Sequence, residues 1–268
     1  MGTLKHAMQL KQVSCGYSGK EILGNVNLSI ESGKLTVMMG RNGSGKSTLL
    51  KSMAGLLPFR GNILVHEKPL KDLSSVQRAR QMAFLSQQHK AAFPFLVKEV
   101  VLTGRAAYTK FIPGKADKRK VELALEYAGI GHLRDRFYTE LSGGEQQLVM
   151  IARLLAQESP LLLMDEPVSH LDYPHQLKVL DLAKQLVHQG KTIVMILHDP
   201  NLAFHYGDRF LFVHQQQVVS ASTAEPWNEP IFEQLFEGKL QPISHQQQIY
   251  FIPQTHHGHS HQNPYKSL

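Results

Sequence analysis

The chain has 268 residues, of which 42% are hydrophobic and 19% charged, proportions typical of a globular protein with a substantial core. No apolar run approaches the roughly 18–20 residues that span a bilayer, and the N-terminus lacks the apolar segment of a secretory signal. The net charge of +7 comes from scattered Lys and Arg, so nucleic acid is not an expected partner. A single cysteine, Cys15, excludes an intrachain disulfide and fits a reducing compartment.

The first part of the chain is rich in predicted strands. Residues 8–37 alternate in strand fashion, and Gly61–Val65 and Met82–Leu85 are two further short strands, with a short helix expected over Ser74–Arg80. One predicted strand places three apolar residues on the same face: Val26, Leu28 and Ile30. This part is expected to form a mainly antiparallel sheet beside the strand that ends at Met39.

A glycine-rich motif, G-x-x-x-x-G-K-[ST], follows that strand. The strand is predicted over Lys34–Met39 and a helix over Thr48–Ala54, so the motif lies between a strand and a helix N-terminus, where backbone N–H groups can hold phosphate. The motif is formed by Gly40, Arg41, Asn42, Gly43, Ser44, Gly45, Lys46, Ser47 and Thr48. Lys46 is expected to reach the β- and γ-phosphates and Ser47 to bind Mg²⁺. The alternative is a glycine-rich turn without a ligand.

The middle of the chain is predicted to be helical and the later part to alternate between strand and helix. Helices are expected over Lys98–Arg105 and Asp117–Ala128, which makes residues 88–140 a mostly helical insert. The elements expected after it are helix Glu145–Gln157, strand Leu161–Met164, helix Pro174–Gln189, strand Thr192–Leu197, helix Asn201–Tyr206 and strand Arg209–Val213. This alternation favours a parallel sheet.

Two carboxylates end one of these strands. Asp165 and Glu166 follow four apolar residues, the arrangement of a Walker B strand next to a P-loop strand. Asp165 would hold Mg²⁺, and Glu166 would polarise the attacking water as a general base. The alternative is a pair of surface acids at a strand end.

The segment Leu141–Gln147, which reads L-S-G-G-E-Q-Q, precedes a predicted helix. It resembles the signature motif of the ATP-binding-cassette (ABC) ATPases, with Ser142, Gly143 and Gly144 as a second phosphate-binding helix N-terminus. The resemblance implies an α/β P-loop NTPase fold with a RecA-like core, an antiparallel β subdomain and a helical subdomain at about 88–157, all within residues 1–253. It also implies a homodimer that holds each ATP between the P-loop of one copy and the signature of the other.

The remaining elements of that family follow in order. By resemblance, Tyr17 stacks on adenine, Gln87 contacts Mg²⁺ and the attacking water, and His198 contacts the γ-phosphate. Gln88 is the alternative to Gln87 by a register of one. Asp172 ends the loop Ser169–Asp172, which crosses to the second copy. The implied catalytic residues are therefore Glu166, His198, Gln87 and Lys46, and the implied Mg²⁺ ligands are Ser47, Gln87 and Asp165.

The segment Phe93–Arg105 resembles the corresponding region of ATPases from importers of iron–siderophore complexes, haem and cobalamin. This resemblance implies a subunit that binds two permease subunits at the cytoplasmic face of the inner membrane, with a substrate-binding protein as an indirect partner. Phe93 and Phe95 would line the permease groove, or would simply pack in the helical core. The alternatives are a soluble ABC ATPase of iron–sulfur cluster assembly, an importer of free metal ions or of an oxyanion such as molybdate, and a regulator that uses ATP-driven dimerisation as a clamp.

Residues 254–268 are polar and rich in histidine, which predicts a flexible tail. The segment holds His256, His257, His259 and His261. Imidazoles at this density can bind a transition metal, and the alternative is a polar tail without a ligand.

Overall fold

The computed structural model describes residues 5–17, 19–87, 94–109, 112–169, 171–221, 225–246 and 248–254. The predicted His-rich segment and the positions of Gln88 and Phe93 lie outside these residues. The strands are β1 (His6–Tyr17), β2 (Lys20–Glu31), β3 (Leu35–Gly40), β4 (Phe59–Val65), β5 (Lys68–Pro69), β6 (Met82–Leu85), β7 (Leu161–Met164), β8 (Thr192–Ile196), β9 (Arg209–His214), β10 (Gln217–Ser220), β11 (Leu240–His245) and β12 (Gln248–Pro253). The α-helices are α1 (Lys46–Met53), α2 (Ser75–Gln81), α3 (Val97–Leu102), α4 (Lys115–Tyr127), α5 (Gly143–Ala156), α6 (Tyr173–His188), α7 (Pro200–Tyr206) and α8 (Pro230–Phe236).

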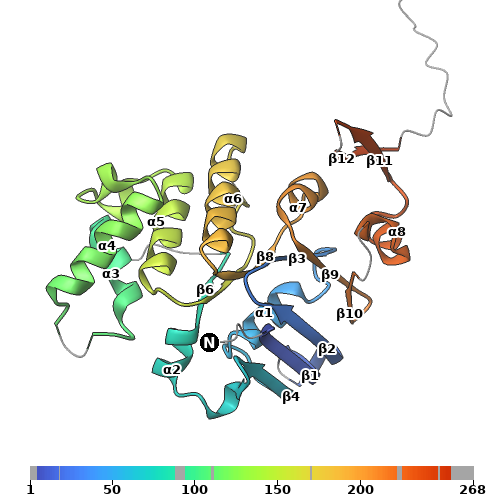
Figure 1. The fold of residues 1–268 in the computed structure, drawn as a ribbon, viewed down its shortest axis with the longest axis horizontal. Coiled ribbons are helices and arrows are strands. Elements are labelled where there is room, and N and C mark those ends of the chain that lie inside the picture. Colours follow the sequence, from blue (N-terminus) through green and yellow to red (C-terminus); the bar gives the residue numbers. More distant parts are fainter. Residues whose placement is uncertain are drawn as a thin grey trace, which may run out of the picture.

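An antiparallel sheet of order β2-β1-β4-β5 forms one part of the molecule, drawn in blue and teal in Figure 1. Val26, Leu28 and Ile30 are all buried, as the period of two in β2 predicts. Cys15, on β1, is also buried, and this burial raises the pKa of its thiol. The prediction of an antiparallel sheet before and after the P-loop strand is therefore confirmed for β1, β2 and β4.

The second sheet has the order β10-β9-β3-β8-β7-β6, and its five strands from β9 to β6 are parallel. The assignment of Met82–Leu85 to the antiparallel sheet was wrong, because β6 pairs in parallel with β7 at the far edge. Its sequence, M-A-F-L, is a continuous apolar run, which suits a strand covered on both faces rather than the alternation of a half-exposed one. Its place beside β7 matters for the site, since parallel strands end at the same edge.

Helices α3, α4 and α5 pack against one another and form a group at one side of the molecule (Figure 1). The predicted helix Lys98–Arg105 is in fact shorter, with α3 continued by a 3-10 turn over Thr103–Arg105. Phe95, before α3, is 53% exposed, which contradicts core packing for this residue. No described helix has the length and apolar content to cross a membrane.

The C-terminal segment packs on α7 through an aromatic cluster. Phe204 of α7 lies 5.0 Å from Phe251 and 5.6 Å from Phe232, measured between ring centroids. Asn201 adds two hydrogen bonds to the backbone of Phe251, one accepted at 2.7 Å and one donated at 3.2 Å. The helix α8 and the β11–β12 hairpin are therefore anchored to the core through residues distant in sequence.

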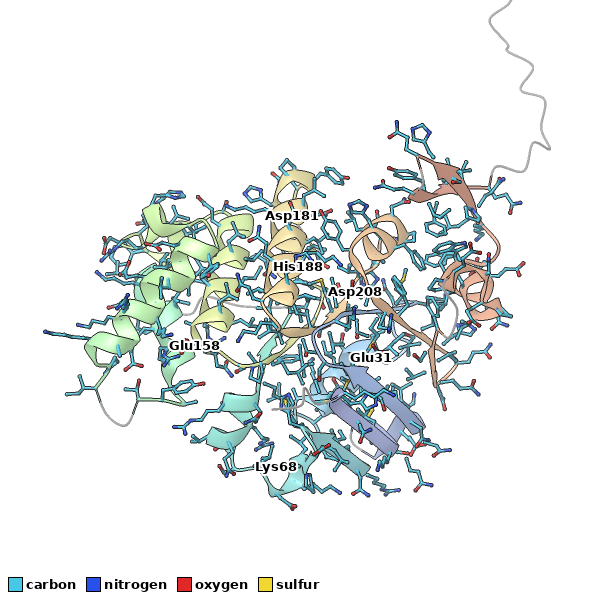
Figure 2. The ribbon with its side chains drawn as sticks, viewed as in Figure 1. Glu31, Lys68, Glu158, Asp181, His188 and Asp208 are labelled. Carbon is cyan, nitrogen blue, oxygen red and sulfur yellow. The ribbon has the colours of Figure 1, made fainter. Side chains whose placement is uncertain are left out.

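The carboxylates of Glu31 and Asp208 link the start of strand β9 to neighbouring elements (Figure 2). Glu31, at the end of β2, accepts hydrogen bonds of 2.7 and 2.9 Å from the Arg209 guanidinium. Asp208 accepts 2.8 Å bonds from the Leu35 backbone N–H and from Lys184 Nζ. These contacts tie the antiparallel sheet, the P-loop strand and α6 to the start of β9.

Candidate nucleotide-binding and catalytic site

The glycine-rich loop between β3 and α1 has a backbone that only glycine adopts easily. Gly43 has φ 76° and Gly45 has φ 105°. A Cβ on Gly45 would also lie 2.9 Å from the Ile22 side chain and 3.0 Å from that of Leu23. The hydroxyl of Ser44 is buried and lacks a hydrogen-bond partner among the described residues. A tight loop with an unsatisfied donor fits a bound oxyanion.

Lys46 begins α1, and only 5% of the residue is exposed. Its Nζ donates to the carbonyl oxygens of Gly40 at 2.8 Å and Arg41 at 2.9 Å. Burial lowers the pKa of Lys46, while the nearby carboxylates of Glu166 and Asp165 act in the opposite direction. These two hydrogen bonds therefore keep the Lys46 ammonium beside the glycine-rich loop, where it can contact a bound phosphate.

Ser47 and Asp165 come from α1 and from the end of β7. The Ser47 hydroxyl donates to Asp165 Oδ1 at 2.8 Å, and Asp165 is 2% exposed. Burial raises the pKa of Asp165, and the Ser47 hydrogen bond opposes that rise. A hydroxyl and a carboxylate oxygen at this distance are the hard ligands that Mg²⁺ prefers.

Glu166 is the centre of the polar contacts at this sheet edge. Its Oε2 accepts from Gln87 Nε2 at 2.7 Å and from Ser169 Oγ at 2.9 Å, and its Oε1 lies 2.7 Å from His198 Nε2. Glu166 has φ 51°, an unusual backbone conformation for a glutamate. Burial disfavours its charged form, but the hydrogen bonds from His198 and Ser169 prevail and hold the pKa of Glu166 below its ordinary value.

The sheet topology explains why these side chains meet. Gln87, Glu166 and His198 each follow the carboxyl end of β6, β7 or β8, three adjacent parallel strands. The ends of parallel strands share one edge of the sheet, where α/β proteins place their ligands. The structure thus brings Gln87 and His198 together at Glu166, while the contacts expected for them with Mg²⁺, water and the γ-phosphate stay predictions.

A cleft of 570 Å³ opens at this edge. Its lining residues are Tyr17, Ile22, Asn42, Gly43, Gly45, Lys46, Ser47, Thr48, Gln87, Glu166, Ser169 and His198. Tyr17 is 44% exposed, which leaves its ring open to a planar ligand. Gly40 instead lines an adjoining cavity of 420 Å³. Sequence reasoning missed Ile22, and it placed Ser169 in the loop that crosses to the second copy without predicting its contact with Glu166.

The signature residues are at a different place in the fold. Ser142 caps α5: its Oγ accepts the Glu145 N–H at 3.3 Å, and the Glu145 carboxylate accepts the Ser142 N–H at 2.8 Å. Gly143 and Gly144 begin the helix, and Asp172 caps α6 by accepting the His175 N–H at 3.1 Å. Neither Ser142 nor Asp172 lines the cleft. One chain therefore carries two separate helix N-termini that suit phosphate, that of α1 at the cleft and that of α5 away from it.

The comparisons with known proteins decide the family. The profile of the ABC transporter family matches residues 23–169, which includes the P-loop, the signature and both carboxylates. The chain belongs to this family. It is 37% identical to the achromobactin transport ATP-binding protein CbrD of Dickeya dadantii, over 86% of this chain and 87% of that protein. It is 42% identical to the hemin import ATP-binding protein HmuV of Gloeobacter violaceus, over 75% of this chain and 76% of that protein.

Solved structures of ABC proteins share the fold. A metal-chelate type ABC transporter in an inward-facing conformation is 28% identical, with a TM-score of 0.78 over 94% of this chain and 98% of that one. The dimeric ABC transporter cassette MJ0796 is 30% identical, with a TM-score of 0.71 over 79% and 96% of the two chains. The expected P-loop ABC ATPase fold is thus confirmed, as is the resemblance to importer ATPases. The ABC protein described here binds and hydrolyses ATP.

Proposed function

We propose that this ABC ATPase energises a binding-protein-dependent importer of an iron chelate (a siderophore complex or haem), of cobalamin or of a related metal complex. The names of its relatives support this cargo class, since they include a hemin import protein and a petrobactin import protein. The partners in this proposal are a second copy of the chain, two permease subunits and, indirectly, a substrate-binding protein. The protein would lie at the cytoplasmic face of the inner membrane. Residues 1–253 would form the ATPase domain, with its helical subdomain at about 88–157.

Each group at the cleft has a role in this proposal. Tyr17 stacks on the adenine, the P-loop N–H groups hold the β- and γ-phosphates, and Lys46 neutralises their charge. Ser47, Asp165 and Gln87 would hold Mg²⁺, for which the 2.8 Å contact between Ser47 and Asp165 is suitable. When bound, Mg²⁺ would withdraw charge from the phosphate oxygens.

The contacts of Glu166 carry the proposed chemistry. A carboxylate with a lowered pKa is ionised at neutral pH and can accept a proton from the attacking water. Gln87 and His198, both 2.7 Å from it, orient the carboxylate, and the second amide hydrogen of Gln87 can face the attacking water. The signature N-terminus at Ser142 and Gly144 of a second copy would complete the phosphate site, so ATP would close the dimer.

The permease surface is proposed around the start of α3. Phe95 is exposed there, and a cavity of 350 Å³ lies between α3 and α4, lined by Lys98, Glu99, Leu102, Lys118, Val121, Glu122 and Arg134. An exposed aromatic beside a mixed polar and apolar hollow fits a short helix of a membrane partner.

The test is to isolate the Glu166→Gln variant with Mg-ATP from membranes in mild detergent and to identify what accompanies it. We expect a polytopic permease in stoichiometric amount. The Lys46→Ala variant, which loses the charge facing the phosphates, is the matched control and should not accumulate the closed complex. Soluble cluster-assembly proteins as the partners of Glu166→Gln would overturn the importer assignment in favour of an iron–sulfur cluster ATPase. A permease whose binding protein carries molybdate or a free metal ion would correct the cargo.

A further inference from the structure

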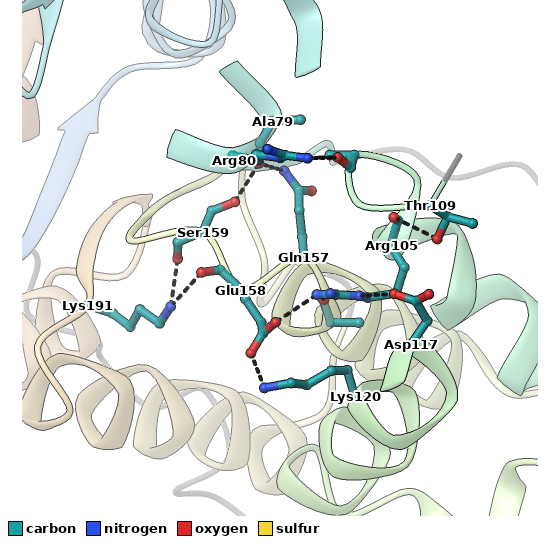
Figure 3. Close-up of polar contacts among 12 residues, drawn as sticks. Ala79, Arg80, Arg105, Thr109, Asp117, Lys120, Gln157, Glu158, Ser159 and Lys191 are labelled. Carbon is teal, nitrogen blue, oxygen red and sulfur yellow. Dashed lines mark hydrogen bonds and ion pairs between the residues drawn. The ribbon is translucent and has the colours of Figure 1, made fainter. Parts of the chain in front are cut away.

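The Arg105 side chain lies within the group formed by α3, α4 and α5. It does not line the cleft, and the proposed chemistry gives it no role. It ends the 3-10 turn after α3, and its side chain is only 7% exposed. Its Nε donates to Asp117 Oδ1 of α4 at 3.1 Å, and its Nη1 donates to the carbonyl of Ala156, the last residue of α5, at 2.7 Å. One guanidinium therefore holds α3, α4 and the C-terminal end of α5 together (Figure 3).

The backbone next to Arg105 packs as closely as the side chain. A Cβ on Gly104 would lie 2.2 Å from the Arg153 carbonyl of α5, so only glycine permits this approach. Arg153 in turn donates from Nε to the Thr103 hydroxyl at 3.0 Å. The 3-10 turn thus contacts α5 through three consecutive residues, and the position of α5 depends on it.

The same network reaches the parallel sheet through the segment that follows α5. Arg105 Nη1 donates to Glu158 Oε2 at 2.8 Å, and Lys120 also contacts that carboxylate. Gln157 Nε2 donates to the Ala79 and Met82 carbonyls at 2.6 and 2.9 Å, and Ser159 Oγ donates to Ala79 at 2.7 Å. These bonds join the end of α5 to α2 and to the first residue of β6, the strand that leads to Gln87.

A second arginine adds to the same junction. Arg80 of α2 donates from Nη2 to the Ala107 carbonyl at 3.0 Å, and its guanidinium lies 5.2 Å from the Tyr108 ring centroid. Arg105 lies 4.1 Å from the same ring. The Tyr108 ring is therefore shared by a cation from α2 and a cation from the helical group.

We propose that Arg105 is a positioning residue for ATP hydrolysis, because it sets the orientation of the signature helix α5 relative to the P-loop core. Ser142, Gly143 and Gly144 form one end of α5, and Arg105 holds the other end. A helix of this length moves as a rigid rod. A tilt at Ala156 therefore also displaces Ser142, which lies at the other end of the helix, about 20 Å from Ala156. The planar guanidinium serves three acceptors in different directions, which a single lysine ammonium does not reproduce.

This inference rests on the proposed role of Ser142 and Gly144, and three measurements separate the two. Arg105→Lys is compared with Arg119→Lys, a matched change at an exposed position of α4 in the same helical group. The readouts are binding of a fluorescent ADP, which reports the P-loop, ATP-dependent dimerisation in the Glu166→Gln background, and steady-state ATPase.

We expect Arg105→Lys to keep the ADP affinity within about twofold while turnover at saturating ATP falls about tenfold, as small displacements at a reacting centre do. Half-maximal dimerisation should need about tenfold more ATP. Arg119→Lys should match the parent protein in all three. Equal turnover and dimerisation for the two lysine variants would overturn the proposal, as would an ADP affinity that falls in parallel with activity.

If Arg105→Lys does not fold, Asp117→Asn tests the same network, since it weakens a single acceptor. A smaller loss of turnover with unchanged ADP binding is then expected, and parent-like turnover would refute the role. By contrast, failure of Gly144→Asp to reduce activity would count against the proposed signature contact and not against the network at Arg105.

Discussion

The imidazole of His198 lies 2.7 Å from the Glu166 carboxylate, at the ends of two adjacent parallel strands. With Gln87 on the other carboxylate oxygen, this contact keeps Glu166 ionised and aimed into the cleft. In the proposed function this arrangement separates two tasks, since the P-loop would bind the nucleotide and the strand ends would act on the water.

The Glu166→Gln variant should retain ATP binding and lose turnover by a factor of about a hundred or more, the usual contribution of a general base. The amide keeps the size of the side chain and cannot accept the proton. ATPase rate and fluorescent-nucleotide affinity, measured together, check the prediction. Turnover at the parent rate would refute Glu166 as the base. His198→Ala should also lower the rate while it leaves ADP binding nearly unchanged.

Gly45→Ala should impair nucleotide binding and destabilise the loop by about 1–3 kcal/mol, the cost of a strained left-handed residue. At φ 105° the new methyl group would also press on Ile22 and Leu23. Titration with fluorescent ADP and thermal unfolding provide the two readouts. Gly131→Ala is the control, because a Cβ there has open space and the backbone is not left-handed. Parent-like ADP affinity in Gly45→Ala would contradict the geometry described for this loop.

Gly144→Asp separates folding from phosphate binding. A Cβ at Gly144 meets only ordinary contacts, the nearest at 3.7 Å from the His175 ring, and a carboxylate in the first turn of α5 favours the helix by about 0.3–1 kcal/mol. The same charge would repel a γ-phosphate, so turnover should fall about tenfold or more. Unfolding temperature and ATPase rate are measured side by side. A variant that is stable and fully active would show that this helix end does not meet phosphate.

Stability at low pH should depend on Asp208. Burial would raise the pKa of this carboxyl, but its bonds with Lys184 and the Leu35 N–H prevail and hold it below the ordinary 3.8. A lowered folded-state pKa contributes stability that is complete above about pH 5 and is lost as the pH falls through 3.8 and below. Denaturant unfolding from pH 7 to pH 3 should show this loss in the parent protein.

The Asp208→Asn variant removes that pH dependence together with its stabilisation. We expect it to lose about 1.5–3 kcal/mol at pH 7, typical of hydrogen bonds to a charged group. Its difference from the parent should shrink as the pH falls toward 3. Asp135→Asn, in an exposed pair with Lys98, is the control and should change little. A difference that is constant with pH would exclude the ionised carboxylate as the cause.

The strand ends and helix N-termini that form the candidate site could be predicted from the sequence because their motifs are local. The P-loop, the two carboxylates after β7 and the helix cap at Ser142 are each short stretches whose backbone chemistry can be read directly. The sheet to which β6 belongs could not be predicted in this way. A four-residue apolar strand fits either sheet, and its partner β7 is distant in sequence.

The C-terminal elements were not predicted for a similar reason. The segments that form α8 and the β11–β12 hairpin are short, and their apolar residues have no clear period of their own. They are stabilised by contacts with Phe204 and Asn201 of α7, which only the folded structure brings near Phe232 and Phe251. The contact of Ser169 with Glu166 was not predicted, because a hydroxyl three residues after a carboxylate carries no pattern that reveals a hydrogen bond.

Cys15, buried on β1 and the sole cysteine of the chain, has a practical consequence. A thiol with a raised pKa and little access reacts slowly with maleimides, so the native protein needs no prior removal of its cysteine. A cysteine introduced at an exposed position such as Leu56 or Tyr173 would become the selective attachment point for a fluorophore or spin label. The opening and closing of two copies around ATP could then be followed by distance measurements in an otherwise unaltered chain.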